Sequence, residues 1–434
     1  MIEPYRAVLR NPDFRRLWGG SLLSLVGDGA TWTALAWISV TRGGAQALAP
    51  LGVCYFAPVV FGGWLAGKAV DRFSRRRLLV ADSLIRATVV AMIPVSAVLG
   101  SLSVWQVYAA AAIYGLFKIL PIGIIPAVIP ELVPESQIPS AFGLESVAYG
   151  AAGLAGPALG GLMIPFVGAP AVVALDAVSY LAFAGLVLGM KARLDRPSPE
   201  SGVASEPVAR HLSGAWRPVL AFIAGDRVML AFLLAFPMFN IAMGMLNIVQ
   251  PWLAHDRLAG GARTLGLLVG VLAAAELVGS LTAGARRSPA RPLLWIGGAQ
   301  MICGAGLLLF LGASLSMILL GEIVCALPAG FAAVCSQTVR YERIPEHLRA
   351  RTLTLISTLI LGAVPLGSLV AGPLLAAGHY DLVVMLMVAF VGPPGLLFVC
   401  LAGTTVGTER PAPGRGAERA HPLPAYATNK GEVR

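Results

Sequence analysis

The sequence predicts an all-α polytopic membrane protein with twelve transmembrane helices, arranged as two six-helix pseudo-repeats. Three observations support this fold class. Of the 434 residues, 57% are hydrophobic and only 12% are charged, which is about half the charge of an ordinary soluble domain. The apolar residues form runs long enough to cross a bilayer, which takes about 20 residues per helix. A polar segment divides these runs into two sets of six.

The runs define two bundles and two polar segments. The first six predict an N-terminal six-helix bundle over 1–190, with approximate bounds of 17–41, 47–67, 78–99, 104–129, 140–165 and 169–190. The last six predict a C-terminal bundle over 227–404, with approximate bounds of 229–254, 264–285, 293–311, 315–339, 352–377 and 382–404. Residues 191–226 have the Pro, Ser and charge content of a cytoplasmic linker. Residues 405–434 are polar and Pro-rich, which predicts a disordered cytoplasmic tail.

The loop charges predict the orientation, because positively charged loops stay in the cytoplasm. If the N-terminus is inside, the exterior loops contain only Arg42, Arg257 and Arg263. Two further basic residues, Arg86 and Lys118, lie within runs, which leaves 27 of the 32 on the cytoplasmic side. We therefore expect a multi-pass protein of the cell inner (cytoplasmic) membrane with both termini in the cytoplasm.

The two halves share features at a fixed spacing. An Arg pair at 75–76 recurs 211 residues later at 286–287, and a Pro-Glu pair at 134–135 recurs at the same distance at 345–346. Chance similarity between membrane loops is the alternative explanation. Two parallel six-helix repeats joined by a linker are typical of transporters that alternate access to a site near the bilayer midplane.

The composition also excludes several classes of protein. The net charge of +10 would suggest nucleic acid in a soluble protein, but here the basic residues lie between apolar runs, so no nucleic-acid partner is expected. The five cysteines are scattered singly, with no CxxC pair, so neither a metal site nor another cofactor is predicted. Isolated acids and scattered histidines leave a polytopic membrane enzyme only as a remote alternative. No G-x4-G-K-[ST] motif is present, so an ion gradient is the expected energy source.

The segment GKAVDRFSRRRL at 67–78 carries a recognisable loop motif. It resembles the signature G-x-x-x-D-R-x-G-R-R that major facilitator superfamily transporters have between helices 2 and 3. Ser74 replaces the second glycine of that signature. The resemblance implies the major facilitator fold and a conformational gating loop, formed by Gly67, Asp71, Arg72, Arg75 and Arg76.

The fifth run resembles a second superfamily motif, G-x8-G-x3-G-P-x2-G-G, which is typical of exporters. Ala152 stands where the second glycine of that motif would be. Small residues at this period let helices pack closely, so packing alone is the alternative explanation. The matching residues are Gly143, Gly156, Pro157, Gly160 and Gly161.

Three longer segments, at 11–37, 75–87 and 129–144, resemble the bacterial exporter branch of macrolide efflux pumps and the enterobactin exporter, with relatives of the lysophospholipid transporter. This resemblance implies a secondary active transporter that exports a drug, antibiotic or siderophore. The R-x-x-Q-G motif that many multidrug antiporters have in helix 4 is missing here, and Lys118 is the only cation in that run. Their proton mechanism therefore does not transfer unchanged.

Ionisable groups within a bilayer are unfavourable by about 2.5 to 3.5 kcal/mol each on insertion scales, so they pair, stay neutral or face a cavity. Asp28 is the strongest functional candidate, because it lies roughly 16 Å into the first run, near the middle of a core about 30 Å thick. Ser24 and Trp32 share its helix face. The alternative role for Asp28 is an interhelical tie. Asp82 and Arg86, four residues apart, predict a local neutral pair, and Asp176 is expected to have a structural role.

Other candidates for proton coupling or the central cavity have two open interpretations, cavity lining or interhelical pairing. Either Glu145 or Glu276 is a candidate partner for Lys118. Polar and aromatic side chains predict a substrate cavity for an amphipathic molecule, although many such side chains pack against lipid or other helices. The coupling candidates are Asp28, Lys118, Glu145, Glu276 and Glu322, and the cavity candidates are Ser24, Trp32, Tyr55, Tyr149, Phe239, Asn240 and Asn247.

These observations lead to one functional prediction with two alternatives. We expect proton-coupled export of an amphipathic small molecule by alternating access, with the lipid bilayer, a small-molecule substrate and protons as partners and a monomer as the working unit. A lysophospholipid or lipid flippase on the same fold is the alternative. A membrane enzyme is the remote alternative.

Overall fold

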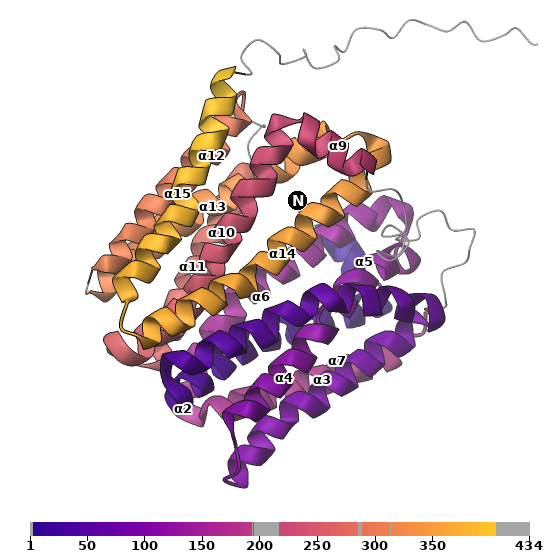
Figure 1. Ribbon diagram of the computed structural model, residues 1–434. Coiled ribbons are helices and arrows are strands. Elements are labelled where there is room, and N and C mark those ends of the chain that lie inside the picture. The colour runs from indigo at the N-terminus through magenta and orange to yellow at the C-terminus, as the bar shows by residue number, and fades with distance from the viewer. Residues whose placement is uncertain (1–2, 193, 195–216, 285–288, 313, 405–434) are drawn as a thin grey trace, which may run out of the picture.

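The computed structural model describes residues 3–192, 194, 217–284, 289–312 and 314–404. Within these ranges every regular element is a helix (Figure 1). The N-terminal half contains α1 (Glu3–Leu9), α2 (Pro12–Arg72), α3 (Arg75–Val98), α4 (Val104–Phe117), α5 (Ile119–Leu132), α6 (Ile138–Val167) and α7 (Ala169–Leu188). The C-terminal half contains α9 (Arg217–Gly225), α10 (Arg227–Trp252), α11 (Ala262–Gly284), α12 (Pro292–Leu308), α13 (Leu315–Arg343), α14 (Glu346–Ala376) and α15 (Tyr380–Thr404). The prediction of an all-α polytopic fold is confirmed.

The longest helix, α2, is a hairpin of two arms. Its backbone reverses at Gly44, which has φ 61° and ψ −159°, a conformation that only glycine adopts without strain. The arms contain the predicted runs 17–41 and 47–67. In the described residues, ten further helical segments are long and apolar enough to cross a membrane. Together with the arms of α2, they agree with the expected twelve spans.

One predicted span, 104–129, is interrupted at Lys118. Helix α4 ends at Phe117 and α5 begins at Ile119, and Pro121 follows within a turn. Proline lacks the N–H that would bond the carbonyl four residues earlier, here that of Phe117, and its ring crowds that carbonyl. The interruption places the Lys118 side chain in the interior of the N-terminal half.

The two halves share one core at one end of the bundle and have separate cores at the other. We call the end with Gly44 the hairpin end, and the end where the chain leaves α7 the linker end. One buried cluster combines Leu48 and Leu51 of α2 with Met245 of α10 and Ala371 of α14. At the linker end, one buried cluster lies wholly in the N-terminal half and another wholly in the C-terminal half.

Close approaches between the halves follow the same division. Helix α2 packs on α14, and α6 packs on α11. A Cβ on Gly372 would meet Ala49, and one on Gly161 would meet the backbone of Gly266. Trp37 lies edge-on to His255 at a ring distance of 5.8 Å. All of these contacts lie toward the hairpin end, so the structure is closed there.

The predicted linker contains a helix. Residues 217–225 form α9, whose Val219 and Ile223 are buried in the core of the C-terminal half. Asp226 then caps α10 by accepting hydrogen bonds from the N–H groups of Val228 and Met229. The apolar spacing of 219 and 223, one turn apart, favours this short helix. Most of the remaining linker, and the predicted tail over 405–434, lie outside the described residues.

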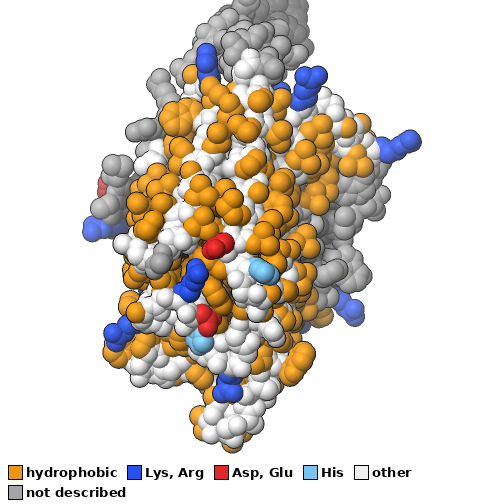
Figure 2. Space-filling view, turned by 60° about the vertical axis from the view of Figure 1, so that its left-hand side comes forward, with side chains coloured by type: hydrophobic (Ala, Val, Ile, Leu, Met, Phe, Trp, Pro, Cys, Tyr) orange, Lys and Arg blue, Asp and Glu red, His pale blue; other side chains and the backbone are white. Residues whose placement is uncertain are grey.

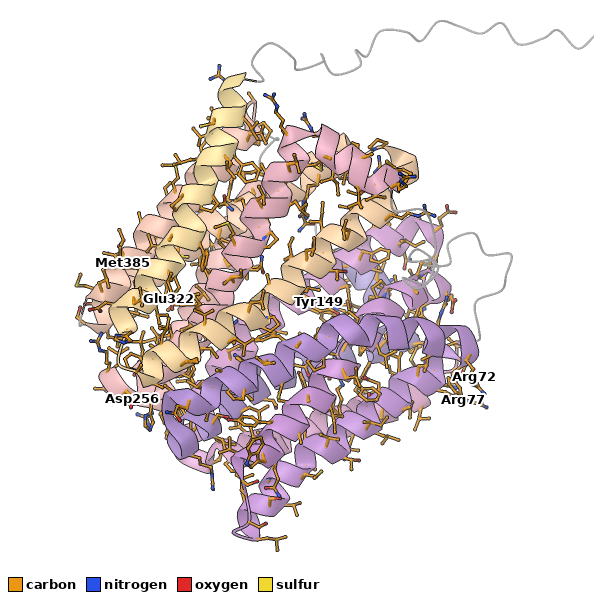
Figure 3. All side chains as sticks on the ribbon, viewed as in Figure 1. Arg72, Arg77, Tyr149, Asp256, Glu322 and Met385 are labelled. Atoms are coloured by element: carbon orange, nitrogen blue, oxygen red, sulfur yellow. The ribbon has the colours of Figure 1, made fainter. Side chains whose placement is uncertain are left out.

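The outer surface has the character expected of a protein surrounded by lipid. The face in Figure 2 is covered mainly by hydrophobic side chains, with most of its Lys and Arg side chains toward its edges. Many large apolar side chains are exposed, among them Val98, Trp105 and Phe166. Figure 3 places Arg72 and Arg77 at the linker end, Asp256 at the hairpin end and Tyr149 between them.

Candidate transport site

A buried cluster of charged groups surrounds Arg86 in the N-terminal half. Arg86 is 2% exposed, and its Nη2 and Nε donate to Asp82 Oδ2 at 2.7 and 3.1 Å. Its Nη1 lies 3.1 Å from the Tyr180 hydroxyl and 3.5 Å from Asp28 Oδ1. The guanidinium also lies over the Tyr180 ring, 4.3 Å from the ring centroid. One cation therefore serves two carboxylates on two helices.

Asp28 is buried and bonded, with 6% of its surface exposed. The Tyr180 hydroxyl donates a hydrogen bond to Asp28 Oδ1. One turn further along α2, Thr31 donates to Asp176 Oδ2 at 2.6 Å, and Ser179 donates to Asp176 Oδ1 at 3.0 Å. These bonds tie the first arm of α2 to α3 and α7. Asp28 thus lies inside the N-terminal half, while also bordering a cavity.

Helical spacing assembles this cluster. Asp82 and Arg86 are four residues apart on α3, and residues 176 and 180 are four apart on α7, so each pair shares one helix face. Glycines let α2 approach its neighbours. A Cβ on Gly27 would collide with Asp176, and one on Gly29 would lie 2.7 Å from the Cδ atom of Pro157.

A small cavity of about 30 Å³ adjoins Asp28 and Arg86. This is roughly the volume that one water molecule takes up in the liquid. Its lining combines apolar residues of α5 and α7 with polar groups from α2, α3 and α6, and with Lys118. The polar lining residues are Ser21, Ser24, Asp28, Arg86, Lys118 and Tyr149. Four of the predicted site residues therefore meet in one place.

Lys118 lies beside a tyrosine rather than beside either glutamate considered from the sequence. Its Nζ is 3.4 Å from the Tyr55 hydroxyl and 5.1 Å from the centroid of the Tyr55 ring. The Tyr55 ring stacks on Tyr114 at 5.0 Å and contacts Trp32 at 4.6 Å. Tyr55 is only 3% exposed. Two residues of the predicted lining, Trp32 and Tyr55, thus form a packed cluster with Tyr114 between α2 and α4, at the edge of the charged site.

The three predicted glutamates lie in different surroundings. Glu145 of α6 is buried, and its Oε1 has no hydrogen-bond partner among the described residues. Glu276 is exposed on α11. Glu322 of α13 is fully buried in the C-terminal half, where its Oε1 accepts a hydrogen bond from Gln250 at 2.7 Å. In Figure 3, Glu322 lies nearer to the end marked by Asp256 than to the linker end.

The exposed face of α11 around Glu276 borders the space between the halves. Gly266 and Leu277 of α11 contact α6, while Gly279 contacts α13. Glu276 lies between these two faces at helical spacing. The other exposed face of α11 carries Leu267, Val278 and Leu281 and is apolar. A carboxylate avoids lipid, so the face with Glu276 is the one turned inward.

Asn240 and Asn247 of α10 are half-buried. The Asn240 side-chain amide donates to the carbonyl of Phe236 at 2.9 Å, within the same helix. Phe239 packs against the shared core. Asn247 lies two turns beyond Asn240 on the same face, since seven residues make about two turns. The structure leaves both asparagines on one face of α10, as the sequence spacing predicts.

The basic loop between α2 and α3 anchors the linker end. Arg75 pairs with Glu131 of α5. Arg76 donates to the carbonyls of Val187 and Leu188 at 3.2 and 3.1 Å, where a cation also stabilises the negative end of the α7 dipole. Arg72 is exposed. The surroundings of the other two motif residues, Gly67 and Asp71, lie outside the described part of the structure.

The small residues of α6 face two different neighbours. Gly156 and Gly160 pack against the backbone of α2 near Gly29 and Ala30, and Gly161 packs against α11 of the other half. Pro157 lies against Gly29, whereas Gly143 is near Tyr5 of α1. The exporter-like motif thus holds α6 against both its own half and the opposite one.

The sequence did not predict that Arg86 and Tyr180 would be the partners of Asp28. Asp82 and Arg86 were expected to neutralise each other locally, which they do, but Arg86 also reaches Asp28 and Tyr180. Tyr180 itself was not singled out. Its spacing of four residues from Asp176 on α7 was the available signal, since it predicts a polar face on an otherwise apolar helix.

A family model described as transmembrane secretion effector matches residues 4–408. The chain belongs to this family of the major facilitator superfamily. The multidrug efflux pump Tap of Mycobacterium tuberculosis is 29% identical over 384 residues, which cover 84% of this chain and 87% of that pump. Macrolide efflux protein A of Streptococcus pyogenes is 21% identical over 362 residues, covering 82% and 87%.

Solved structures of major facilitator transporters share the fold. A bacterial homologue of the iron transporter ferroportin, in an inward-facing state, has a TM-score of 0.67 at 17% identity and covers 90% of this chain and 98% of that one. A bacterial homologue of the lysosomal transporter Spinster, also inward-facing, has a TM-score of 0.67 at 14% identity, with coverages of 95% and 99%. This secretion effector family member is therefore a multi-pass membrane protein with the major facilitator fold.

Proposed function

We propose that this protein exports an amphipathic small molecule, such as a drug or antibiotic, in exchange for protons. The observation that carries the proposal is the buried cluster of Asp28, Arg86 and Tyr180 beside a small polar cavity. Ionisable groups at this depth are retained where they serve transport or proton relay. The printed names of the relatives, a multidrug pump and a macrolide efflux protein, support a drug as the substrate.

The arrangement of the halves supports an alternating-access cycle with an inward-open resting state. The halves share a core at the hairpin end and have separate cores at the linker end. The positive-inside rule assigns the linker end to the cytoplasm, because Arg72 and Arg75–Arg77 lie there. Substrate would then enter from the cytoplasm and the bilayer, and rocking of the two halves would open the hairpin end to the exterior.

The side chains toward the space between the halves suit an amphipathic ligand. Glu276, Asn240 and Asn247 offer charge and hydrogen bonds, and Tyr149 and Phe239 offer aromatic surface. Tyr149 also lines the cavity at Asp28, so a ligand on α6 would lie next to the charged cluster. Competition between a proton and the substrate for the ionised state of that cluster would couple the two fluxes.

Transport by the reconstituted protein tests this function. In proteoliposomes with an imposed pH gradient, the wild type should concentrate erythromycin against its own gradient, and Asp28→Asn should abolish that accumulation. Asp381→Asn is the matched control, because it makes the same chemical change at an exposed residue in the first turn of α15 and should transport normally. Accumulation that persists in Asp28→Asn would remove the role given to Asp28.

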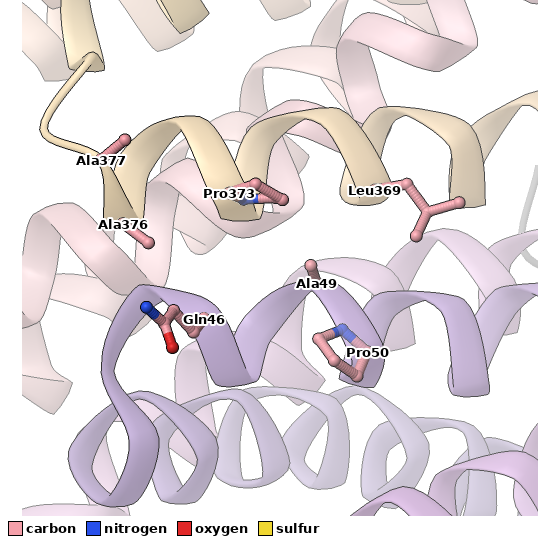
Figure 4. Close-up of a pocket in the computed structure, with 7 residues that line it drawn as sticks. All are labelled: Gln46, Ala49, Pro50, Leu369, Pro373, Ala376 and Ala377. Carbon is pink, nitrogen blue, oxygen red and sulfur yellow. The ribbon is translucent and has the colours of Figure 1, made fainter.

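A lipid flippase is the second candidate, favoured by one feature. A groove of about 510 Å³ runs between α2 and α14 near the hairpin end (Figure 4). Its lining is nearly all apolar and would suit an acyl chain, and it consists of Gln46, Ala49, Pro50, Leu369, Pro373, Ala376 and Ala377. Movement of a fluorescent lysophospholipid across vesicles that contain the protein, without movement of erythromycin, would favour the flippase.

A further inference from the structure

Asp82 has two carboxylate oxygens in very different surroundings. Arg86 donates two hydrogen bonds to Oδ2, whereas Oδ1 is buried and has no hydrogen-bond partner among the described residues. The residue is 1% exposed. A buried carboxylate oxygen without a donor is unfavourable by about 1 to 3 kcal/mol or more. A local ion pair alone leaves this oxygen unexplained.

A second cavity, of about 150 Å³, adjoins Asp82. This volume exceeds what a few water molecules need, since each takes roughly 30 Å³ in the liquid. Among the described residues, Asp82 is the only ionisable one in its lining. The other described lining residues come from α2, α3, α4 and α5, and are Gly62, Ala69, Leu78, Ala81, Leu116, Phe117 and Leu120. None of these residues lines the cavity at Asp28. The two carboxylates that share Arg86 therefore border separate cavities.

The two cavities touch different parts of α3. Residues 78, 81 and 82 line the cavity at Asp82, whereas Arg86, one turn further along α3, lines the cavity at Asp28. Arg86 stands between Asp82 and Asp28 and stays protonated in proteins. Asp82 and Asp28 are thus two carboxylates that share one cation, and this cation keeps its positive charge.

We propose that Asp82 is a second proton-carrying carboxylate, which exchanges a proton with Asp28 under the control of Arg86 and releases it into the cavity of about 150 Å³ beside it. This inference rests on the proposed proton coupling. The proposal gives the proton a route out of the cluster. Arg86 then alternates between the two carboxylates and bonds the one that is ionised. The observed arrangement, with Arg86 bonded to Asp82 at 2.7 Å and to Asp28 at only 3.5 Å, corresponds to the state after release.

Water is the only further reactant that this proton transfer needs. The O–H bond on Asp28 breaks, an O–H bond forms on Asp82 Oδ1 through water, and Arg86 moves its hydrogen bonds from Asp82 to the newly ionised Asp28. Asp82 then gives the proton to water in its own cavity, and Arg86 returns. The other described titratable groups around the cluster are Tyr180 and Asp176 of α7, Tyr114 of α4, Lys118 with its neighbour Tyr55, and Tyr149 of α6 with its neighbour Glu145.

The experiment compares two modes of erythromycin movement in proteoliposomes. For Asp82→Asn, accumulation driven by a pH gradient should fall by about tenfold or more, as expected when a positioned proton carrier is lost. Downhill efflux, driven by the drug gradient alone, should stay close to the wild-type rate, because alternating access needs no proton release through Asp82. Ser83→Ala, at the neighbouring buried hydroxyl that donates to the Leu79 carbonyl of its own helix, should leave both modes unchanged.

The outcomes separate this inference from the proposed function. If the wild type shows no accumulation driven by a pH gradient, the proposed function fails. If the wild type accumulates the drug and Asp82→Asn does so equally well, Asp82 is not a proton carrier. If Asp82→Asn does not fold, Asp82→Glu takes its place in this experiment. It should still accumulate the drug, with a pH profile moved upward by about 0.4 unit, the difference between ordinary Asp and Glu pKa values, and an unmoved profile would overturn the proposal.

Discussion

Gly161 of α6 and Gly266 of α11 touch across the boundary between the two halves. A Cβ on Gly266 would lie 2.7 Å from the Cα atom of Gly161, and one on Gly161 would lie 2.9 Å from the carbonyl oxygen of Ala262. Real side-chain carbons do not come this close to backbone. The two helices therefore approach as closely as they do only because both positions lack a side chain.

The first prediction concerns this contact. Gly161→Ala should force α6 and α11 apart, loosen the hairpin end and slow transport, because the methyl group meets backbone that has no room to move. Gly153→Ala on the same helix is the matched control, since its Cβ would meet nothing within 4 Å. It should raise stability by up to about 1 kcal/mol through helix propensity. Thermal unfolding in detergent and the erythromycin assay measure both effects, and equal behaviour of the two variants would contradict the packing role.

The second prediction separates two buried tyrosines. Tyr180→Phe removes the hydroxyl that donates to Asp28 and accepts from Arg86, so it should lower the free energy of unfolding by about 1 to 3 kcal/mol and reduce accumulation driven by a pH gradient. Tyr114→Phe removes a buried hydroxyl that has no hydrogen-bond partner in the described part of the chain. Its stability should be equal to or above that of the wild type. Denaturant or thermal unfolding of both variants checks the contrast.

The third prediction concerns the ionic balance of the cluster. Arg86→Met should lower the free energy of unfolding by about 3 to 5 kcal/mol, the usual effect of leaving a buried charge without its partner. Adding Asp82→Asn should recover part of that loss, because the amide no longer needs a cation. A double-mutant cycle measured by unfolding in detergent gives the coupling energy directly. Strictly additive losses would mean that Arg86 and Asp82 do not stabilise one another.

The fourth prediction uses a carboxylate outside the membrane-spanning segments. Burial acts to raise the pKa of Asp13, but hydrogen bonds from the backbone N–H groups of Ala192 and Lys191, with Arg16 nearby, lower it below its ordinary value. A lowered folded-state pKa means that the stabilisation is present at neutral pH and is lost as the pH falls through that pKa.

Asp13→Asn should therefore be less stable than the wild type at pH 7, and the difference should shrink in strong acid. The hydrogen bonds at stake hold the start of the linker against α2, with Ala192 N 2.7 Å from Asp13 Oδ2. Thermal unfolding in detergent over a pH series measures the difference. A gap between the two proteins that stays constant from neutral to acidic pH would show that the charge of Asp13 is not what binds this segment.

The fifth prediction tests which face of α11 is open to water. In a variant without its five native cysteines, Glu276→Cys should react with a water-soluble maleimide, because residue 276 is exposed and we infer that its face of α11 is turned away from lipid. Ala275→Cys, one residue earlier, is the control and should react slowly, since Ala275 is 7% exposed. If both cysteines resist the reagent while the protein is folded, Glu276 faces lipid rather than a cavity.

The sequence predicted most of the fold because lipid imposes a simple rule on composition. Apolar length gave the spans, and the break at 191 gave the two halves. The hairpin at Gly44 and the interruption at Lys118 were less visible, since both depend on backbone geometry inside apolar runs. The helix α9 was missed because it is too short and too close to a polar segment to stand out.

Individual residues of the candidate site could be predicted from the sequence, but their assembly into one cluster could not. Depth along the first run identified Asp28, and helical spacing identified the pair of Asp82 and Arg86. Whether these residues meet depends on the orientation of α3 and α7 about their helix axes. A single sequence does not specify that orientation. For the same reason, the sequence left the partner of Lys118 open between two glutamates, and the structure places Lys118 beside Tyr55.

The shared core at the hairpin end also has a consequence for how the cycle responds to its surroundings. The glycine-mediated approaches there join small and apolar residues of the two halves. The linker end carries Arg72 and Arg77 (Figure 3), with Arg75 and Arg76 bonded to α5 and α7 there. Contacts between apolar surfaces are insensitive to ionic strength, while exposed charges are screened within about 10 Å at 0.1 M salt. Added salt should therefore change how readily the cytoplasmic side closes and leave the opening of the exterior side nearly unchanged. Ionic strength would then affect one half of the transport cycle alone.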